Sequence, residues 1–248
     1  MDGNKQKRVV GVYSSDCNVI GSIPDYGVLL DYICEKFKAK EDSGFVFRTQ
    51  KTVERFDKAV ESGILRFENK QHENLFINSI SGDDFSLAEK MIILFWQMIY
   101  ANKLFEKLTR NVFMPAMYQG RITIDAQEGL SYLRQLQQEE PESLPWAEST
   151  LSTTASKYLS ILKKLGLADG SIKKTILHPT VSDKLFVYFI RWALTAEPKN
   201  RTLENPYLYF GFYDKDALIA KLKKIDHIPF WNINQLGYDI IIELKDYE

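Results

Sequence analysis

The hydrophobic and polar positions of the chain repeat mostly with a helical period, which predicts a mainly α-helical fold. Helices are expected at residues 24–38, 48–62, 83–101, 102–118, 125–139, 149–165, 181–196 and 214–224. Residues 91–100 form the most apolar run. Polar residues flank this run, and a membrane span needs about 20 apolar residues, so we expect a buried core helix here. Two short apolar runs, 230–232 and 237–244, predict a small β element near the C-terminus.

A helix and a hairpin are predicted in the segment Trp146–Pro179. The Ser149 hydroxyl can accept a hydrogen bond from a backbone N–H of the first turn. Apolar residues follow with a helical period at Leu151, Ala155, Tyr158, Leu159, Leu162 and Leu165. Gly166 suits the left-handed position at a helix C-terminus, and Asp169-Gly170 is a hairpin dipeptide. With the preceding helix at 125–139, this order predicts a winged helix-turn-helix over about residues 121–179.

The polar face of that helix and the hairpin are locally basic. Residues 149–182 contain five lysines and one acidic residue, whereas the whole chain has 32 basic and 33 acidic residues. In a winged helix-turn-helix, the second helix enters the major groove of DNA. We therefore expect DNA contacts from Thr150, Thr153, Lys157, Ser160, Lys163, Lys164, Lys173 and Lys174. The alternative is an ordinary amphipathic helix with a solvated lysine face, because winged modules also serve as protein docking units.

A second, weaker helix-turn-helix is expected at about residues 25–67. Its second helix, at 48–62, presents basic residues outward, and those expected to contact DNA are Arg48, Lys51 and Arg55. Three acidic residues on the same helix offset these charges. A solvated helix face is therefore the alternative interpretation here.

The length of 248 residues allows two domains. We expect a helical N-terminal domain at 1–120, and a winged-helix domain with an aromatic-rich C-terminal extension at 121–248. The net charge is −1, so any nucleic-acid binding must come from a local patch. The two cysteines, Cys17 and Cys34, show no paired spacing, which favours a reduced, cytoplasmic setting. We expect a monomer.

Motifs for catalysis or cofactor binding are weak. The sequence has no Gly-rich phosphate loop, no paired histidine ligands and no nucleophile elbow, so we expect no cofactor, no bound metal and no enzymatic activity. One alternative is that Asp226, Glu243 and Lys245 follow the order found in metal-dependent nucleases. Aromatic residues cluster at 206–213. We expect a core strand or a protein interface there, although aromatic rings can also stack on bases.

One residue and two stretches carry a family resemblance: Trp146, STLSTTASKYLSILKKLGL at 149–167, and KKTILHP at 173–179. With the expected helices over 91–118, the chain resembles the BrxA family of BREX bacteriophage-exclusion systems over roughly residues 25–195. The resemblance implies a non-catalytic, mainly helical protein that binds double-stranded DNA and works beside the methyltransferase and other components of such a system. No membrane partner is expected, because no apolar run is long enough to span a membrane.

Sequence preference is expected to be weak, because the outward helix face carries no Arg, Asn or Gln. The alternative function is a protein interaction module of the same or another complex, in which DNA binding is incidental.

Overall fold

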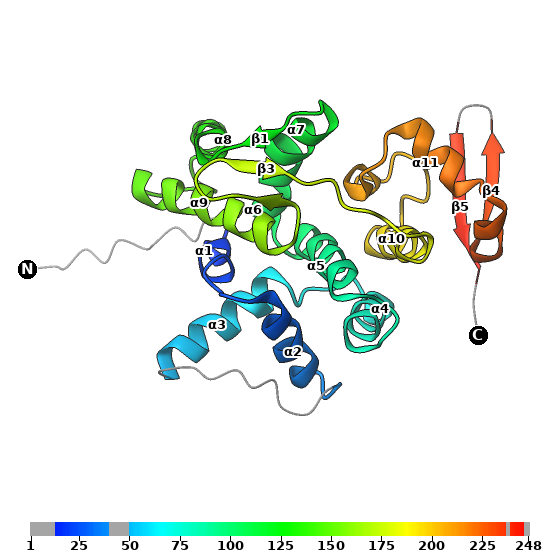
Figure 1. The fold of residues 1–248 in the computed structure, drawn as a ribbon, viewed down its shortest axis with the longest axis horizontal. Coiled ribbons are helices and arrows are strands. Elements are labelled where there is room, and N and C mark those ends of the chain that lie inside the picture. The colour runs from blue at the N-terminus through cyan, green and yellow to red at the C-terminus, as the bar shows by residue number, and fades with distance from the viewer. Residues whose placement is uncertain (1–12, 40–49, 237–238, 246–248) are drawn as a thin grey trace, which may run out of the picture.

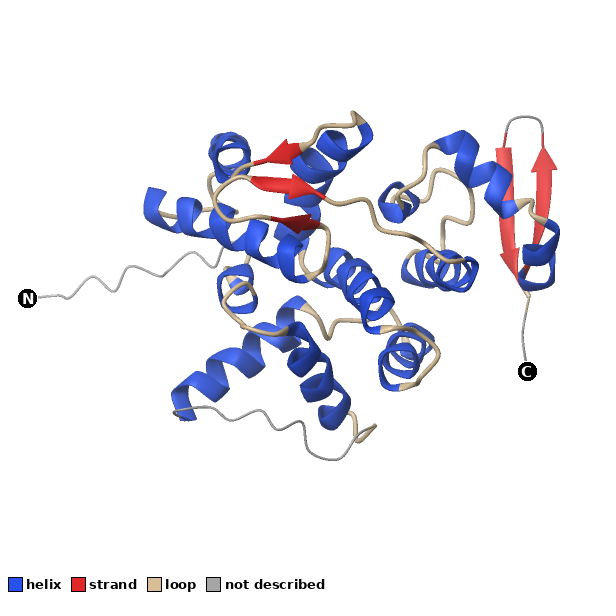
Figure 2. Cartoon of the chain, in the orientation of Figure 1, coloured by secondary structure: helices blue, strands red, loops and turns tan. Residues whose placement is uncertain are grey.

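The computed structural model describes residues 13–39, 50–236 and 239–245, and these residues form a mainly helical protein (Figures 1 and 2). The expected fold class is therefore confirmed. Its N-terminal helices are α1 (Asp16–Ile20), α2 (Tyr26–Lys36), α3 (Gln50–Gly63), α4 (Lys70–Ser81) and α5 (Leu87–Ala101). The sequence pattern did not predict α1 or α4. Asn69 begins α4, since its side chain accepts a hydrogen bond from the backbone N–H of His72.

Helix α5 is the central element of the core, as its apolar sequence predicted. Nearly all of its side chains are buried, and the ring of Trp96 lies 4.7 Å from that of Phe189. The Trp96 indole N–H donates a hydrogen bond of 2.9 Å to the carbonyl of Phe210. The capping box of Ser86 and Glu89 begins this helix.

The single helix expected at 102–118 is present as three consecutive helical pieces. These are α6 (Lys103–Leu108), the π-helical turn η1 (Thr109–Phe113) and α7 (Met114–Tyr118). Pro115 lies in the first turn of α7. The missing N–H of a proline removes little hydrogen bonding there, so the chain continues as a helix.

Two helices and a hairpin follow in the order that the sequence predicted, and a short strand before them completes a small sheet. The elements are β1 (Thr123–Ile124), α8 (Ala126–Glu139), α9 (Glu148–Lys164), β2 (Ala168–Asp169) and β3 (Lys174–Ile176). The sheet is antiparallel with strand order β1-β3-β2, and Thr175 pairs with both Thr123 and Asp169. Asp125 caps α8 through a capping box with Glu128. Strand β1 was not predicted.

Two local details differ from the sequence prediction. Ala147 occupies the N-cap position of α9 without a side-chain hydrogen bond, so Ser149 lies inside the helix and does not cap it. The hairpin loop spans residues 170–173 and is longer than a two-residue turn. Gly170 has a φ of +106°, which favours glycine, whereas Gly166 has the expected left-handed φ of +73°.

The C-terminal part packs against α5 and contains a second antiparallel pair of strands. Its elements are α10 (Asp183–Ala196), η2 (Leu208–Gly211), α11 (Lys215–Leu222), η3 (Ile225–Phe230), β4 (Trp231–Leu236) and β5 (Asp239–Leu244). Strands β4 and β5 pair as expected. The aromatic segment 206–213 forms the 3₁₀ helix η2, and the core strand expected there is wrong. Its rings pack against the helical core.

The buried hydrophobic side chains form one connected core that extends to both sides of residue 120. Helix α6 and the turn η1 contact α8 across that position. These contacts do not test the expected domain boundary at residue 120, which stays a prediction.

Candidate nucleic-acid interface

Helix α9 is covered on two flanks, by α8 and by α1. The buried residues of α9 are Leu151, Thr154, Ala155, Tyr158, Leu159, Ile161 and Leu162. Gly129 of α8 lies against Ala155, and a Cβ at this glycine would lie 3.4 Å from that of Ala155. Gly21, directly after α1, lies even closer to the helix, because a Cβ there would lie 2.8 Å from the carbonyl oxygen of Lys157. Only one face of α9 is left free.

The free face of α9 is a stripe of hydroxyl side chains that ends in a lysine. We name as the α9 stripe the residues Ser149, Ser152, Thr153, Ser156, Ser160 and Lys163, which are exposed except for the half-buried Ser160. At about 100° per residue these positions lie on one side of the helix. The expected face comprised Thr153, Lys157, Ser160 and Lys164, with Thr150 and Ser156 beside it, and α1 lies against its Lys157 edge. Ser149 and Ser152, which the structure exposes on this face, were not expected there.

Three of the five hydroxyl groups of the α9 stripe already donate hydrogen bonds within the helix. Thr153 donates to the carbonyl of Ser149 at 2.8 Å, and Ser156 donates to that of Ser152 at 3.1 Å. Ser160 donates to the carbonyl of Ser156 at 3.0 Å. Their oxygens keep free lone pairs, which accept hydrogen bonds from base amino groups. A phosphate oxygen only accepts, so binding it requires each hydroxyl to rotate.

Two of the expected lysine contacts on α9 lie beside α1. Lys157 and Thr150 are half-buried. The ammonium of Lys164 donates a 2.8 Å hydrogen bond to the carbonyl of Gly21 and lies 5.6 Å from the centre of the Tyr26 ring. Burial, together with the nearby Lys157, lowers the pKa of Lys164. Lys164 therefore fastens the N-terminal helices to α9.

Lysines also fasten the hairpin loop. Lys174 is only 8% exposed, and its ammonium donates to the carbonyls of Gly170 and Ser171. Burial lowers the pKa of Lys174. Lys163 donates to the same Gly170 carbonyl at 3.1 Å and pairs with Asp169 at 2.9 Å.

The structure thus directs Lys174 inward, unlike the phosphate-facing position that the sequence suggested. Lys173 is exposed and pairs with no acidic residue of the described chain.

An acidic residue lies at the start of α9. Glu148 is exposed in the first turn and accepts a 3.0 Å hydrogen bond from Arg134 of α8. This hydrogen bond lowers the pKa of Glu148. A phosphate bound at this helix end would have to approach the Glu148 carboxylate, although Arg134 compensates its charge.

The second candidate helix, α3, lies on the other side of α1 from α9 (Figure 1). Lys51 and Arg55 are exposed, and neither pairs with an acidic residue among those described. The acidic Asp57 and Glu61 of α3 pair instead with Lys36 of α2, at 3.1 and 2.6 Å. We had expected these acidic residues to offset the outward basic residues of the same helix. Instead, Asp57 and Glu61 form their ion pairs with α2. The third expected basic residue, Arg48, lies outside the described residues.

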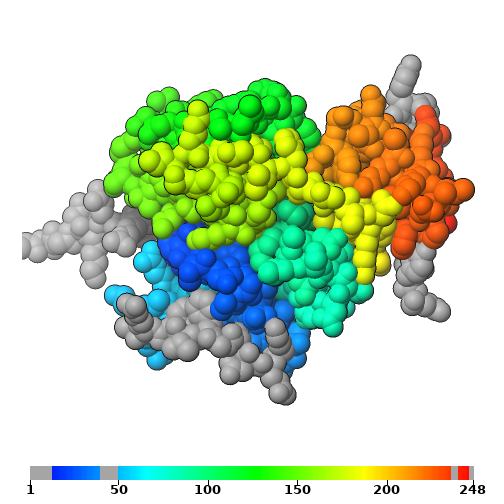
Figure 3. Space-filling view, in the orientation of Figure 1, coloured from blue at the N-terminus to red at the C-terminus, as the bar shows by residue number. Residues whose placement is uncertain are grey.

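Helix α1 brings α3 and α9 to one side of the molecule. A Cβ at Gly63 of α3 would lie 2.7 Å from the side chain of Ile20, so α1 approaches α3 as closely as it approaches α9. In the space-filling view, the N-terminal helices and the region of α9 and the hairpin adjoin on the same face (Figure 3). The structure thus places α3, with Lys51 and Arg55, and α9, with its stripe, on either side of α1.

The residues considered for a nuclease site have other partners. Asp226 pairs with Lys224 at 3.6 Å, and the ammonium of Lys245 donates to the carbonyl of Ile228 at 3.1 Å. Among the described residues, no group of three or more His, Cys, Asp or Glu side chains is arranged to hold a metal ion. No helix in the described part of the chain combines the length and the apolar character that a membrane crossing requires.

Comparison with known proteins identifies one family. No curated protein and no solved structure matched the chain. The profile of the BrxA family matches residues 47–191, which is more than half of the 248 residues. The matched part includes α3 to α9, the β2–β3 hairpin and most of α10. The chain therefore belongs to the BrxA family.

Proposed function

We propose that this BrxA-family protein is a non-catalytic component of a BREX phage-defence system that binds double-stranded DNA. Membership of the family suggests the BREX setting. The observation that carries the DNA proposal is the arrangement of α8, α9 and the β2–β3 hairpin. A helix with one free polar face is followed by a hairpin loop, which hydrogen bonds from Lys163 and Lys174 hold in place and which exposes Lys173. This is the plan of a winged helix-turn-helix, with α9 as the recognition helix.

The composition of the free surface supports binding with little sequence preference. The α9 stripe offers hydroxyl oxygens and one lysine, and it lacks the Arg, Asn and Gln side chains that read base edges in two-pronged contacts. Near α9, Lys157 and Lys173 are available to phosphates, and Lys163 is exposed but already paired with Asp169. Lys164 and Lys174 act inside the protein.

Fluorescence anisotropy with a mixed-sequence duplex tests this function. We expect binding at low salt, and the logarithm of the affinity should fall linearly with the logarithm of the salt concentration. The variant Lys157→Gln/Lys173→Gln should bind more weakly to every sequence, and its salt slope should be smaller by about 2. The matched control, Lys103→Gln/Lys199→Gln, removes two exposed lysines elsewhere and should bind as the original chain does. Absence of binding by the unaltered chain at low salt would contradict the proposal.

The non-catalytic part of the proposal needs a separate assay. Incubation of supercoiled and linear DNA with the protein and Mg²⁺ should leave the DNA intact. Cleavage that disappears in a Glu243→Ala variant would show that the protein is a nuclease instead.

Exposed apolar residues favour a second candidate function, the docking of another subunit. Ile172 in the hairpin loop is 89% exposed, and Ile122 beside β1 is 76% exposed. If the winged unit docks a protein, such as the methyltransferase of the same system, Ile172→Ser should abolish co-purification with that partner. Retained co-purification, together with DNA binding by the same variant, would reject the docking role of this loop.

A further inference from the structure

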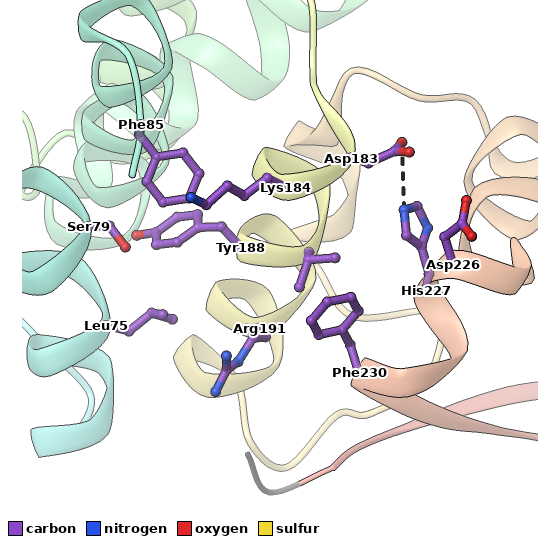
Figure 4. Close-up of a pocket in the computed structure, with 11 residues that line it drawn as sticks. Leu75, Ser79, Phe85, Asp183, Lys184, Tyr188, Arg191, Asp226, His227 and Phe230 are labelled. Atoms are coloured by element: carbon purple, nitrogen blue, oxygen red, sulfur yellow. Dashed lines mark ion pairs between the residues drawn. The ribbon is translucent and has the colours of Figure 1, made fainter. Parts of the chain in front are cut away.

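A pocket lies between α4, α10 and η3, away from α9 and the hairpin (Figure 4). We name it the α10 pocket. Its volume is about 440 Å³, within the range of small-molecule sites in proteins. Its apolar lining consists of Leu75, Phe85, Val187, Tyr188 and Phe230.

The aromatic side of the α10 pocket is held in place by its own contacts. The rings of Phe85 and Tyr188 meet edge to face, with their centres 5.8 Å apart. The ammonium of Lys184 lies 5.2 Å from the centre of the Phe85 ring and pairs with Asp84 at 2.5 Å. These contacts exist without a ligand, so an apolar molecule would enter a preformed site.

One arginine in the α10 pocket has no counter-ion. Arg191 lines the pocket and is half-buried, and its guanidinium makes no ion pair or hydrogen bond within the described parts of the chain. By contrast, Arg110, Arg121 and Arg134 each pair with a glutamate. A partly buried guanidinium presents a fork of N–H donors that suits a carboxylate, sulfonate or phosphate group. Arg191 is therefore the lining group suited to an anionic ligand, and the carboxylates Asp183 and Asp226 also line the pocket.

Two buried polar atoms of the pocket residues also lack partners among the described residues. They are the hydroxyl of Tyr188 and Nε2 of His227, both shielded from solvent. His227 Nε2 lies 3.6 Å from Asp183, as the dashed line in Figure 4 marks, which is too far for a hydrogen bond. Buried polar groups in folded proteins are nearly always hydrogen-bonded, so these two atoms are unsatisfied polar groups in the lining of the pocket.

We propose that the α10 pocket binds a small organic anion with an aromatic or branched apolar body. The anionic group pairs with Arg191, and the apolar body lies over Val187 between Phe85 and Phe230. The pocket shares no residue with the α9 stripe or the hairpin. This site is therefore independent of the proposed DNA binding.

Two fluorescent probes that differ in charge test the proposal. 1-Anilinonaphthalene-8-sulfonate carries an aromatic body and an anion, whereas N-phenyl-1-naphthylamine has the same body without the charge. Both probes should bind the full chain. Arg191→Gln removes the charge, so the dissociation constant of the sulfonate should rise by at least about tenfold, as expected for the loss of a charge-assisted hydrogen bond. The affinity of the neutral probe should not change.

Two further variants locate the binding. Arg66→Gln removes an exposed arginine elsewhere and should leave both affinities unchanged. Val187→Trp fills the pocket and should abolish binding of both probes, provided that circular dichroism shows a folded protein. Equal binding of the sulfonate to Arg191→Gln and to the unaltered chain overturns the proposal, and this comparison does not depend on the tryptophan variant. DNA binding measured on the same samples tests the α9 interface separately, because the pocket shares no residue with it.

Discussion

At the scale of single residues, a buried polar network around His72 joins three segments of the N-terminal part. The ring Nδ1 of His72 accepts a hydrogen bond from the backbone N–H of Glu68 at 3.3 Å. Its Nε2–H then donates to the side-chain oxygen of Gln97, 2.9 Å away. The amide nitrogen of Gln97 in turn donates to the carbonyls of Ile64 and Arg66. The segment that leaves α3 is thus fastened to α4 and α5.

This network predicts a loss of stability in acid. Burial lowers the pKa of His72 from 6.5 to about 4. The unfolded chain therefore binds more protons between these pH values, and the free energy of unfolding falls as the pH drops through this window. The shift corresponds to a contribution of at most about 3 kcal/mol, present above pH 6.5 and lost near pH 4.

Urea unfolding of the original chain and of His72→Gln at several pH values measures the effect. All other titrating groups remain in the variant, so the difference between the two unfolding free energies isolates His72. We expect this difference to shift in favour of the variant as the pH falls from 7 to 4. A difference that stays constant would show that His72 does not contribute.

Residue roles in the candidate site were predictable only in part. The left-handed Gly166 follows from helix termination. The inward position of Lys174 could also have been predicted, because residues i and i+2 of a strand point to the same face and Ile176 is buried. The hydrogen-bond acceptors of the Lys174 ammonium could not have been predicted, since they are carbonyls of the hairpin loop that the fold brings together.

At the scale of elements, helices with a strong apolar period were predicted, and those whose burial depends on distant contacts were not. Helix α1 has only five residues, too few to show a period. Helix α4 carries an N-cap at Asn69 and buried positions four residues apart at His72, Phe76 and Ile80. Its buried histidine hides that pattern. The missed α1 also explains why Lys157 and Lys164, which lie beside it, were expected on the free face of α9.

The packing of α1 on α9 can be tested with two alanine substitutions. Gly21 has an ordinary helical φ of −65°, so alanine causes no backbone strain there. Its Cβ would, however, meet the backbone of Lys157 at 2.8 Å. We expect Gly21→Ala to lower the free energy of unfolding by about 1–3 kcal/mol, as overpacking does.

Urea unfolding measures this change, and hydrogen exchange should become faster in α1 and α9. Gly27→Ala is the matched control, since its Cβ would meet only the flexible Asp25 side chain. The close contact would be disproved if both variants had the same stability.

At the scale of the whole molecule, the fold combines surfaces that lie far apart in the sequence. Residues near 21 and 157 meet because α1 lies between α3 and α9, and no local pattern encodes this contact. With a net charge of −1, the protein attracts DNA only where its basic residues gather. Helix α3, which carries Lys51 and Arg55, lies on the other side of α1 from α9 (Figure 1).

The salt dependence of DNA binding decides whether α3 and α9 contact one duplex. Each phosphate contact contributes about 0.9 to the slope of log affinity against log salt, because it releases counter-ions from the DNA. If both helices bind the same duplex, Lys51→Gln/Arg55→Gln should reduce the slope by about 1.8. Lys103→Gln/Lys199→Gln, which removes two charges elsewhere, should leave it unchanged. A variant of α3 that keeps the original slope and affinity would confine the interface to α9 and the hairpin, since the loss of two phosphate contacts cannot leave the slope intact.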